Sequence, residues 1–475
     1  MVLWKQNKYL ISFLAVALCL VSWFLFHEEL ESLWIILGSI VAIVSITLFV
    51  SKLNRILLFV FLFTPLSLDI LISGGFKISA PTEITIVLLA FLFIIKWLSG
   101  LSIHSTILKH PISILLILDL AWSFVSLVFS EYQDVAFKRI LLKVLFIGVF
   151  YFVSTQLLLK ISDQKRLFWL YGIGMIIPIM NAFYKHHLLD FLQSSSVYVC
   201  QPFYNDHTIY AACLAFIIPF FILQIFNTSQ KRFRILSILL SALFLTAFIL
   251  SYSRAAWISI AIAFVFYIAT LFKVRFWQLI LLVAIIAGYL IVNFNPIYDQ
   301  LRQNEAKYDD DVSTHITSVT NLQNDASNLE RINRWVCAYR MFLDRPIAGH
   351  GSGTYQFVYD QYQTPEFMTR ISSHQGNKGN AHSEYLTYLS ENGIIGFILF
   401  TALVLYSVYL GIQLLYKINE PEHKMLIYSI LLGLITFYTH GLFNTFSDYD
   451  KMAVLYWGSL AILVRMDLRY GNASS

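Results

Sequence analysis

The chain has 475 residues, of which 58% are hydrophobic and only 13% are charged. Soluble domains carry about 25% charged residues, so this composition excludes a soluble protein and predicts an integral membrane protein. The net charge of +5 comes mostly from lysines and arginines in short loops, and it therefore does not indicate a nucleic-acid partner.

Fourteen apolar segments follow one another along the chain. Each is near the length of about 20 residues that a transmembrane helix needs, and the last is the shortest. The predicted spans are 9–26, 33–50, 55–72, 83–99, 112–130, 139–159, 167–184, 208–226, 235–252, 255–272, 276–294, 393–415, 425–445 and 452–465. We therefore expect an all-α polytopic membrane protein with about 12–14 transmembrane helices and one long, partly helical outer loop.

Basic residues fall in alternate loops, which orients the chain because cytoplasmic loops carry the excess of Lys and Arg. The basic set contains Lys5 and Lys8, Lys52 and Arg55, Lys96 and Lys109, Lys160, Lys165 and Arg166, Lys231, Arg232 and Arg234, Lys273 and Arg275, Lys417 and Lys424, and Arg465 and Arg469. The alternate set contains 27–32, 73–82, 131–139, 185–207, 252–255, about 295–392, and 447–451. We predict that both termini are cytoplasmic and that the long loop lies outside.

These assignments divide the chain into four segments. Residues 1–207 form N-terminal transmembrane helices, 208–294 form the helices that lead to Arg254, 295–392 form the outer loop, and 393–475 form the C-terminal helices. Within the loop, 298–330 is polar, whereas 330–346 has a helical pattern that Pro346 would end. The glycine-rich turn PIAGHGSGTY follows.

Three arginines are predicted to lie on the outer side. Arg254 follows Ser251 and Ser253 at the end of a span, where the group resembles an anion cradle; the alternative is an arginine that anchors the helix at the interface. Arg331 and Arg334 are three residues apart and share one region of a helix surface. Guanidinium groups bind phosphate through paired hydrogen bonds, although such a pair also occurs on an ordinary solvated helix face.

His382 is predicted to lie at the outer membrane surface, just before the span at 393–415. An imidazole with a pKa near 6.5 can act as a general base there. A structural histidine is the alternative, and His350 in the glycine-rich turn is a second candidate for the base.

Two patterns could indicate a metal. The first is the cluster His186, His187 and Asp190, and the second is the acidic run Asp309–Asp311. Ordinary loop histidines and a solvated acidic loop are the favoured interpretations of the two, so we predict no metal site.

The cysteines and the polar residues within the spans leave alternatives open. The four cysteines form no C-x-x-C pair. Cys200 and Cys337 fall in outer loops and could form a disulfide, with two free thiols as the alternative. Asp119, His440 and Asn444 lie within predicted spans and are functional candidates on that ground, but they do not form a proton relay.

Over about residues 200–450, the chain resembles the bacterial O-antigen ligase and polymerase superfamily. The resemblance is carried by the order, the spacing and the shared membrane side of three motifs. They are S-x-S-R (Ser251, Ser253, Arg254), R-x-x-x-W with P-x-x-G-x-G-x-G (Arg331, Trp335, Pro346, Gly349, Gly351, Gly353), and A-H-x-x-Y-L with E-x-G-x-x-G (Ala381, His382, Tyr385, Leu386, Glu391, Gly393, Gly396). The family often has Asn directly after the motif histidine, where this chain has Ser383.

The resemblance implies a metal-independent, inverting glycosyltransferase of the bacterial inner membrane, with its active site in the periplasm and no cofactor. Such an enzyme moves a glycan from undecaprenyl pyrophosphate to a lipid or glycan acceptor. Its other partners would be the lipids of the membrane. Arg254 and Arg331 would hold the pyrophosphate, and His382 would activate the acceptor hydroxyl. The remaining substrate-binding residues would be Ser253, Arg334, Trp335, Gly351, Gly353 and Tyr385.

Within this family, the sequence favours an O-antigen ligase slightly, with a polymerase or a protein O-oligosaccharyltransferase as alternatives. A lipid-oligosaccharide flippase would place charged residues across many spans, and a scaffold protein would not need the arginines and the histidine. The glycan, the acceptor and the oligomeric state are not determined by the sequence.

Overall fold

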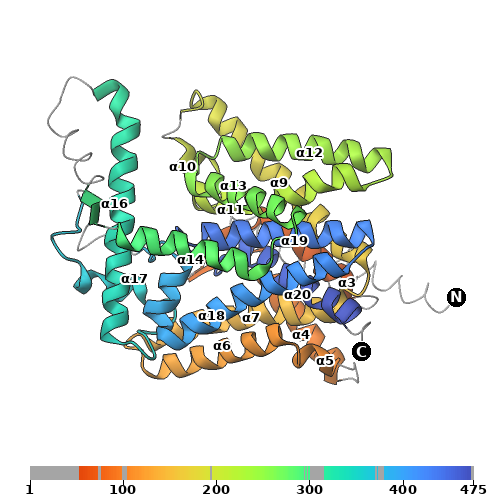
Figure 1. Ribbon diagram of the computed structural model, residues 1–475, viewed down its shortest axis with the longest axis horizontal. Coiled ribbons are helices and arrows are strands. Elements are labelled where there is room, and N and C mark those ends of the chain that lie inside the picture. The colour runs from red at the N-terminus through yellow and green to blue at the C-terminus, as the bar shows by residue number, and fades with distance from the viewer. Residues whose placement is uncertain are drawn as a thin grey trace, which may run out of the picture.

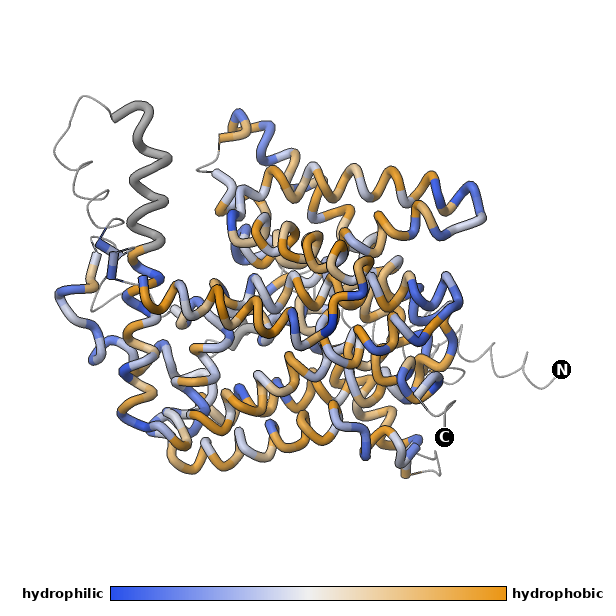
Figure 2. Tube along the Cα trace, in the orientation of Figure 1, coloured by the Kyte–Doolittle hydropathy of each residue, from blue (hydrophilic) through white to orange (hydrophobic). Residues whose placement is uncertain are grey.

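The computed structural model describes residues 53–72, 76–98, 104–192, 195–293, 295–296, 298–299, 315–369, 372 and 379–471. The predicted spans 9–26 and 33–50 and the acidic run 309–311 lie outside the described residues. Figure 1 shows a bundle of long helices, with α16 standing upright beside one end of it. Figure 2 shows apolar residues along the bundle helices and polar residues at their connections.

The first half of the described chain contains short and long helices and one hairpin. Its elements are α3 (Leu53–Phe63), the 3₁₀ turn η1 (Thr64–Leu66), β1 (Leu68–Ile72), β2 (Phe76–Ala80), α4 (Thr82–Leu98), α5 (Ser105–Leu108), α6 (Pro111–Val128), α7 (Gln133–Phe146), the π-helical segment η2 (Ile147–Val153), α8 (Ser154–Leu157), α9 (Ile161–Leu188) and α10 (Ser196–Val199).

In the second half of the chain, all the described elements are helices. Its elements are α11 (His207–Asn227), α12 (Lys231–Ile249), α13 (Arg254–Leu271), α14 (Phe276–Val292), α16 (His315–Asp344), α17 (Tyr355–Val358), the 3₁₀ segment η5 (Tyr359–Tyr362), α18 (Glu384–Lys417), α19 (Pro421–His440) and α20 (Asp450–Tyr470).

The predicted fold class is confirmed: this is an all-α polytopic membrane protein. Among the described residues, seven helices are long and apolar enough to cross a membrane. They are Pro111–Val128, Gln133–Leu157, Ile161–Leu188, His207–Asn227, Lys231–Ile249, Arg254–Leu271 and Glu384–Lys417. Leu53–Leu66 and Phe276–Val292 are shorter apolar helices.

Two predicted boundaries are wrong. The span at 55–72 ends as a helix at Phe63, and β1 pairs with β2 in antiparallel register. Pro65 lacks the N–H that would continue the helix, and the isoleucine-rich strand β1 then favours an extended chain. Residues 315–329 of the polar segment are also helical, because α16 begins at His315. As expected, α16 ends just before Pro346.

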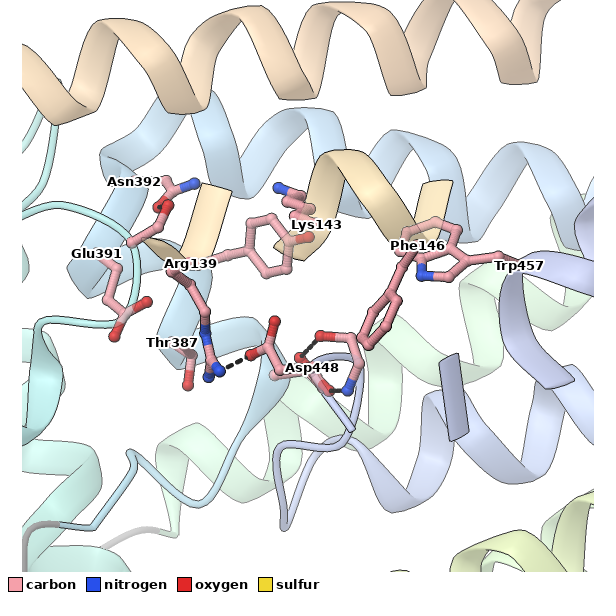
Figure 3. A pocket seen from close by; sticks show the side chains of 12 residues that line it. Arg139, Lys143, Phe146, Thr387, Glu391, Asn392, Asp448 and Trp457 are labelled. Atoms are coloured by element: carbon pink, nitrogen blue, oxygen red, sulfur yellow. Dashed lines mark hydrogen bonds and ion pairs between the residues drawn. The ribbon is translucent and has the colours of Figure 1, made fainter. Parts of the chain in front are cut away.

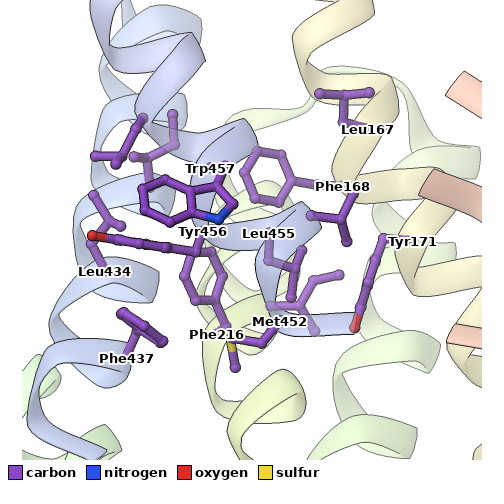
Figure 4. Packing of buried hydrophobic residues seen from close by; sticks show 14 of the residues in the cluster. Leu167, Phe168, Tyr171, Phe216, Leu434, Phe437, Met452, Leu455, Tyr456 and Trp457 are labelled. Atoms are coloured by element: carbon purple, nitrogen blue, oxygen red, sulfur yellow. The ribbon is translucent and has the colours of Figure 1, made fainter. Parts of the chain in front are cut away.

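The core is built on α11, which is buried on nearly all sides and packs against α19. Phe216 of α11 is fully buried, and Phe437 of α19 stacks on Tyr456 of α20 with ring centroids 4.4 Å apart (Figure 4). A Cβ atom at Gly433 would come within 2.7 Å of the Phe216 ring, so this glycine lets α11 and α19 approach closely. Tight van der Waals packing of this kind holds helices together in lipid, where no hydrophobic force acts between them.

At each end of the bundle, the contacting loops belong to the same predicted set, either the basic set or the alternate set. At the end with the basic loops, Lys165 pairs with Glu422 at 2.8 Å and His110 bonds to Asp467 at 3.2 Å. At the other end, Tyr252 donates to the carbonyl of Phe191 at 3.2 Å, and Glu384 accepts from the loop after α19. These contacts agree with the alternation predicted from charge, because none of them joins a loop of one set to a loop of the other.

Cys200 and Cys337 are free and buried, so the disulfide considered from the sequence is wrong. Each thiol contacts its own surroundings: the Cys200 Sγ lies 3.9 Å from the carbonyl of Val197, and the Cys337 Sγ lies 3.9 Å from the Asn333 side chain. Cys337 instead packs in a small outer core with Met341 and Tyr355.

The orientation is testable with topology reporters. Fusions at residues 200 and 340 should report the periplasm, and fusions at 232 and 420 should report the cytoplasm, because the basic loops stay inside. A pair of fusions such as alkaline phosphatase and green fluorescent protein at each site would read both sides. A cytoplasmic signal at residue 340 would contradict the predicted orientation, since α16 would then face the wrong compartment.

Candidate active site

The candidate active site lies at the end of the bundle away from the basic loops, where five separate pieces of the chain meet. They are the start of α11, the start of α13, the helix α16, the turn before α18, and the end of α19 with its following loop. Electrostatic interactions within this group connect Arg254 and Arg331, and Arg331 with His207, His382 and His440. The structure therefore brings together the two arginines and the histidine that the sequence predicted.

Arg254 and Arg331 reach this place from different elements. Arg254 is the first residue of α13, and Arg331 belongs to α16. Burial lowers the pKa of Arg331, and the positive charge of Arg254 lowers it further. Arg254 is exposed and Arg331 is half-buried, so their two positive charges meet where a bound polyanion could reach both and offset their repulsion.

The S-x-S-R segment forms a tight turn. The Ser251 hydroxyl donates to the carbonyl of Phe248 at 2.6 Å and accepts from the Ser253 N–H at 3.4 Å. Tyr252 between them has φ of +51°, and Ser253 then occupies the N-cap position of α13. The turn thus places Arg254 on the first turn of a helix, where the helix dipole also favours an anion.

The Arg334 guanidinium has several partners within the protein. Its Nε lies 2.9 Å from a carboxylate oxygen of Glu330, and its Nη1 donates to the carbonyl of Asn380 at 3.2 Å. The guanidinium also lies over the ring of Tyr359, 5.0 Å from its centroid. Arg334 therefore ties α16 to the segment before His382, and its role in substrate binding remains a prediction.

Two hydrogen bonds fix the backbone around His382. Its N–H donates to Asn380 Oδ1 at 3.0 Å, and its carbonyl accepts from Trp335 Nε1 at 3.3 Å. Its φ is +50°. Ser383, which replaces the asparagine common in the family, is the N-cap of α18 and accepts from the N–H of Leu386 at 3.4 Å. The departure from the motif therefore starts a helix, and Asn380 supplies the amide that orients the histidine.

The surroundings of His382 keep its imidazole neutral. Burial lowers its pKa to about 4, and the positive charges of Arg331 and Arg334 act in the same direction. A side-chain hydrogen bond with Asn444 opposes them. A neutral imidazole can accept a proton, as a general base requires. His350, the second candidate, is 2% exposed and its Nε2 lies 3.1 Å from the carbonyl of Met341, so it is engaged with the backbone.

Several buried polar atoms of the described residues at this end of the bundle have no hydrogen-bond partner. They are His207 Nδ1, Tyr210 Oη, both ring nitrogens of His440, and Asn444 Nδ2. Buried polar groups are rarely unsatisfied, so such a group of atoms indicates a place where a polar ligand binds. His207 and Tyr210 lie one turn apart on α11 and therefore on one face.

Sequence reasoning named His440 and Asn444 only as polar residues within a span, and it missed His207 and Tyr210. The one sequence signal for the latter pair was the N-cap residue Asp206, whose carboxylate accepts from the N–H groups of Thr208 and Ile209. That cap shows that His207 is the first residue of the helix, but it does not show what the side chain faces.

The predicted site residues Gly351, Gly353 and Tyr385 contact other parts of the protein. The Glu391 carboxylate accepts from the N–H of Gly353 at 2.6 Å and of Tyr355 at 3.0 Å, and its carbonyl accepts from Gly351 at 2.8 Å. Gly351 has φ of +104°. Tyr385 donates to the carbonyl of Tyr438 at 3.2 Å. The glycine-rich turn is thus held against the start of α18, and substrate contacts of these three residues remain predictions.

A second polar cluster lies between α7, α18 and α20 (Figure 3). Arg139 pairs with Asp448 at 2.6 Å, and Lys143 pairs with Asp119 at 2.8 Å. The pocket among these side chains has a volume of about 30 Å³. That volume holds about two water molecules, so this pocket does not hold a sugar. Asp119, a candidate from the sequence, thus neutralises a buried lysine.

The described residues contain no group of three or more His, Cys, Asp or Glu side chains that could hold a metal ion. In the HHxxD cluster, the His186 ring stacks on Phe191 with centroids 5.9 Å apart. Asp190 has φ of +49° in the turn after α9.

Comparison with protein families finds that residues 239–401 match the family described as O-antigen ligase. Comparison with curated proteins finds no match. The matched region contains Arg254, Arg331 and His382, and it confirms the resemblance drawn from the three motifs. It supports a membrane glycosyltransferase of the O-antigen ligase and polymerase type.

The low pKa of His382 gives a testable titration. In the detergent-purified protein with ¹³C-labelled histidine, the NMR signal of His382 is the one that is missing in the His382→Gln variant. We expect this signal to titrate near pH 4. It should move toward 6.5 in Arg331→Gln, which removes one of the charges that oppose protonation. Because the unfolded imidazole binds its proton below about pH 6.5, this residue should destabilise the fold as pH falls from there toward 4. A wild-type midpoint above pH 6 would contradict this assignment.

Proposed function

We propose that the protein transfers a glycan from undecaprenyl pyrophosphate to an acceptor hydroxyl at the periplasmic face of the bacterial inner membrane. The observation that carries the proposal is the meeting of Arg254, Arg331 and His382 at one end of the bundle. These groups provide an anion site beside a neutral base, which is what glycosyl transfer from a pyrophosphate requires.

In the proposed reaction, the acceptor oxygen attacks the anomeric carbon while the bond from that carbon to the pyrophosphate oxygen breaks. The bonding electrons leave with the pyrophosphate, and His382 takes the proton of the acceptor hydroxyl. A single displacement of this kind inverts the anomeric configuration. Arg254 and Arg331 stabilise the charge that develops on the leaving group, so the proposed reaction requires no metal.

The unsatisfied polar atoms suggest where the sugars lie. His207, Tyr210, His440 and Asn444 together offer ring nitrogens, a hydroxyl and an amide, all of which can bond to sugar hydroxyls. We propose that they bind the transferred glycan or the acceptor next to the pyrophosphate.

Among the members of this class we favour an O-antigen ligase, as the sequence does slightly, while the family match supports ligases and polymerases alike. A polymerase or a protein O-oligosaccharyltransferase would use the same residues with another acceptor. A flippase would line its path with charges, and it is disfavoured because the buried Asp119 of α6 and Lys143 of α7 pair with each other.

Substitutions at the site test the mechanism in a reconstituted assay with undecaprenyl-pyrophosphate-linked glycan. His382→Ala should lower the rate by about 100- to 10,000-fold, as the loss of a general base does. Arg254→Lys and Arg331→Lys should nearly abolish transfer, because lysine keeps the charge but loses the bidentate fork. Arg340→Lys is the matched control on α16, and its effect should be mild.

Activity should also survive EDTA, since the arginines supply the positive charge. Wild-type turnover by His382→Ala would refute the assigned base. Loss of activity in EDTA that Mg²⁺ or Mn²⁺ restores would instead indicate a metal-dependent enzyme and would contradict the proposed leaving-group stabilisation.

The acceptor is identified by the glycan profile of a deletion strain. A ligase should leave long chains on the lipid carrier, with none attached to the final acceptor. Single-repeat products on the final acceptor would indicate a polymerase and would contradict the ligase assignment, and modified proteins that lose their glycan would indicate protein glycosylation. Complementation with the wild-type gene and with His382→Ala separates the enzyme's activity from its mere presence.

A further inference from the structure

A second cavity lies at the opposite end of the bundle from the candidate active site. It has a volume of about 560 Å³ and lies between the start of α9, the start of α19 and the end of α20. This volume is in the range of ordinary ligand sites. Its polar lining consists of Lys160, Ser162, Gln164, His423, Arg465 and Arg469.

Two of the positive charges in this cavity are not paired by the protein. Within the described part of the chain, the side chains of Lys160 and Arg465 form no ion pair and no hydrogen bond. Two basic residues just outside the cavity behave differently, because Lys165 pairs with Glu422 and Arg166 pairs with Asp163, each at 2.8 Å. Lys160 and Arg465 are thus left without carboxylates, whereas Glu420 and Glu422 act on His423 in the same cavity.

Gln164 adds an acceptor at the bottom of the cavity. Its side chain is 2% exposed, and its Nε2 donates to the carbonyl of Leu158 at 2.9 Å. That bond fixes the amide, and its Oε1 has no hydrogen-bond partner among the described residues. A buried acceptor without a partner is costly unless a ligand or a water donates to it.

The first turn of α9 supplies further attraction for an anion. Ile161 and Ser162 line the cavity at the start of this 28-residue helix, where free N–H groups and the helix dipole favour negative charge. Leu159, Met466 and Leu468 form an apolar part of the wall, and Leu159 is 52% exposed. A ligand here meets cations, a hydrogen-bond acceptor and an apolar surface together.

We propose that this cavity binds the headgroup of an anionic phospholipid that carries a hydroxyl group, such as phosphatidylglycerol. Arg465, Lys160 and Arg469 hold the phosphodiester, a headgroup hydroxyl donates to Gln164 Oε1, and an acyl chain lies along Leu159 and Leu468. The cavity is at the end with the basic loops, where anionic lipids are attracted to Lys and Arg. This site is separate from glycosyl transfer and does not depend on the function proposed above.

Lipid titration followed by native mass spectrometry of the full-length protein in detergent tests the proposal. Phosphatidylglycerol should bind at least about tenfold more tightly than phosphatidylcholine with the same acyl chains, because only the former has a net negative headgroup. Arg465→Gln and Lys160→Gln should each weaken its binding about fivefold. Arg166→Gln removes the same charge from the same end of the bundle but from outside the cavity, and it should leave the binding unchanged.

A second variant tests the acceptor. Gln164→Met should remove the preference for phosphatidylglycerol over phosphatidylmethanol, a phosphodiester lipid without a headgroup hydroxyl.

Lys160 is exposed, so the Lys160→Gln variant keeps the test valid if Arg465→Gln does not fold. Thermal unfolding reports whether each variant is folded. An equal loss of phosphatidylglycerol binding in Arg166→Gln would overturn the proposal. Equal binding of phosphatidylglycerol and phosphatidylcholine to the wild-type protein would also overturn it. Displacement of the lipid by millimolar inorganic phosphate would identify a soluble anion as the ligand and would overturn the lipid assignment.

Discussion

The repulsion between the charges of Arg254 and Arg331 is a constraint that the outer end of this protein must satisfy. Arg254 is exposed and Arg331 is half-buried, so the rest of the fold has to hold the second cation beside the first. The pairing of Arg334 with Glu330 and the bond from Trp335 to His382 fix α16 against the segment before α18. The free energy that this arrangement costs becomes available to any ligand whose negative charge offsets it.

Burial and the charges of Arg331 and Arg334 govern the ionisation of His382. Without an anion, they lower its pKa to about 4, so the imidazole is neutral but a weak base. A pyrophosphate bound at Arg331 would offset one of these charges, and the pKa of His382 would rise. The proposed base would therefore become stronger only when the donor is bound, which favours proton transfer in the complete complex over proton uptake by the empty site.

The sequence predicted most helices within a few residues, because apolar runs of this length have one stable conformation in lipid. The span at 208–226 is α11, His207–Asn227, in the structure. The hairpin β1–β2 was not predicted, because hydropathy does not distinguish an apolar strand from the end of an apolar helix. Pro65 was the available signal for that boundary.

The site was predictable to the extent that its residues belong to motifs. Arg254, Arg331 and His382 were found in this way, whereas the partner of Arg334 follows from the four-residue spacing to Glu330 and could have been recognised. His207 and Tyr210 could not, because their importance depends on which helix lies opposite α11, and that is a property of tertiary packing.

The packing of α11 against α19 connects the core to the site. His207 stands at the outer end of α11 and His440 at the outer end of α19, and the two side chains interact electrostatically. Gly433, about two turns before His440, sets how closely the helices approach, because any side chain there would meet the ring of Phe216. The spacing of the unsatisfied nitrogens is therefore determined within the membrane, by a glycine and a phenylalanine that touch no substrate. The proposed ligand site at the membrane surface thus depends on the apolar interior of the protein for its geometry, as well as for its stability.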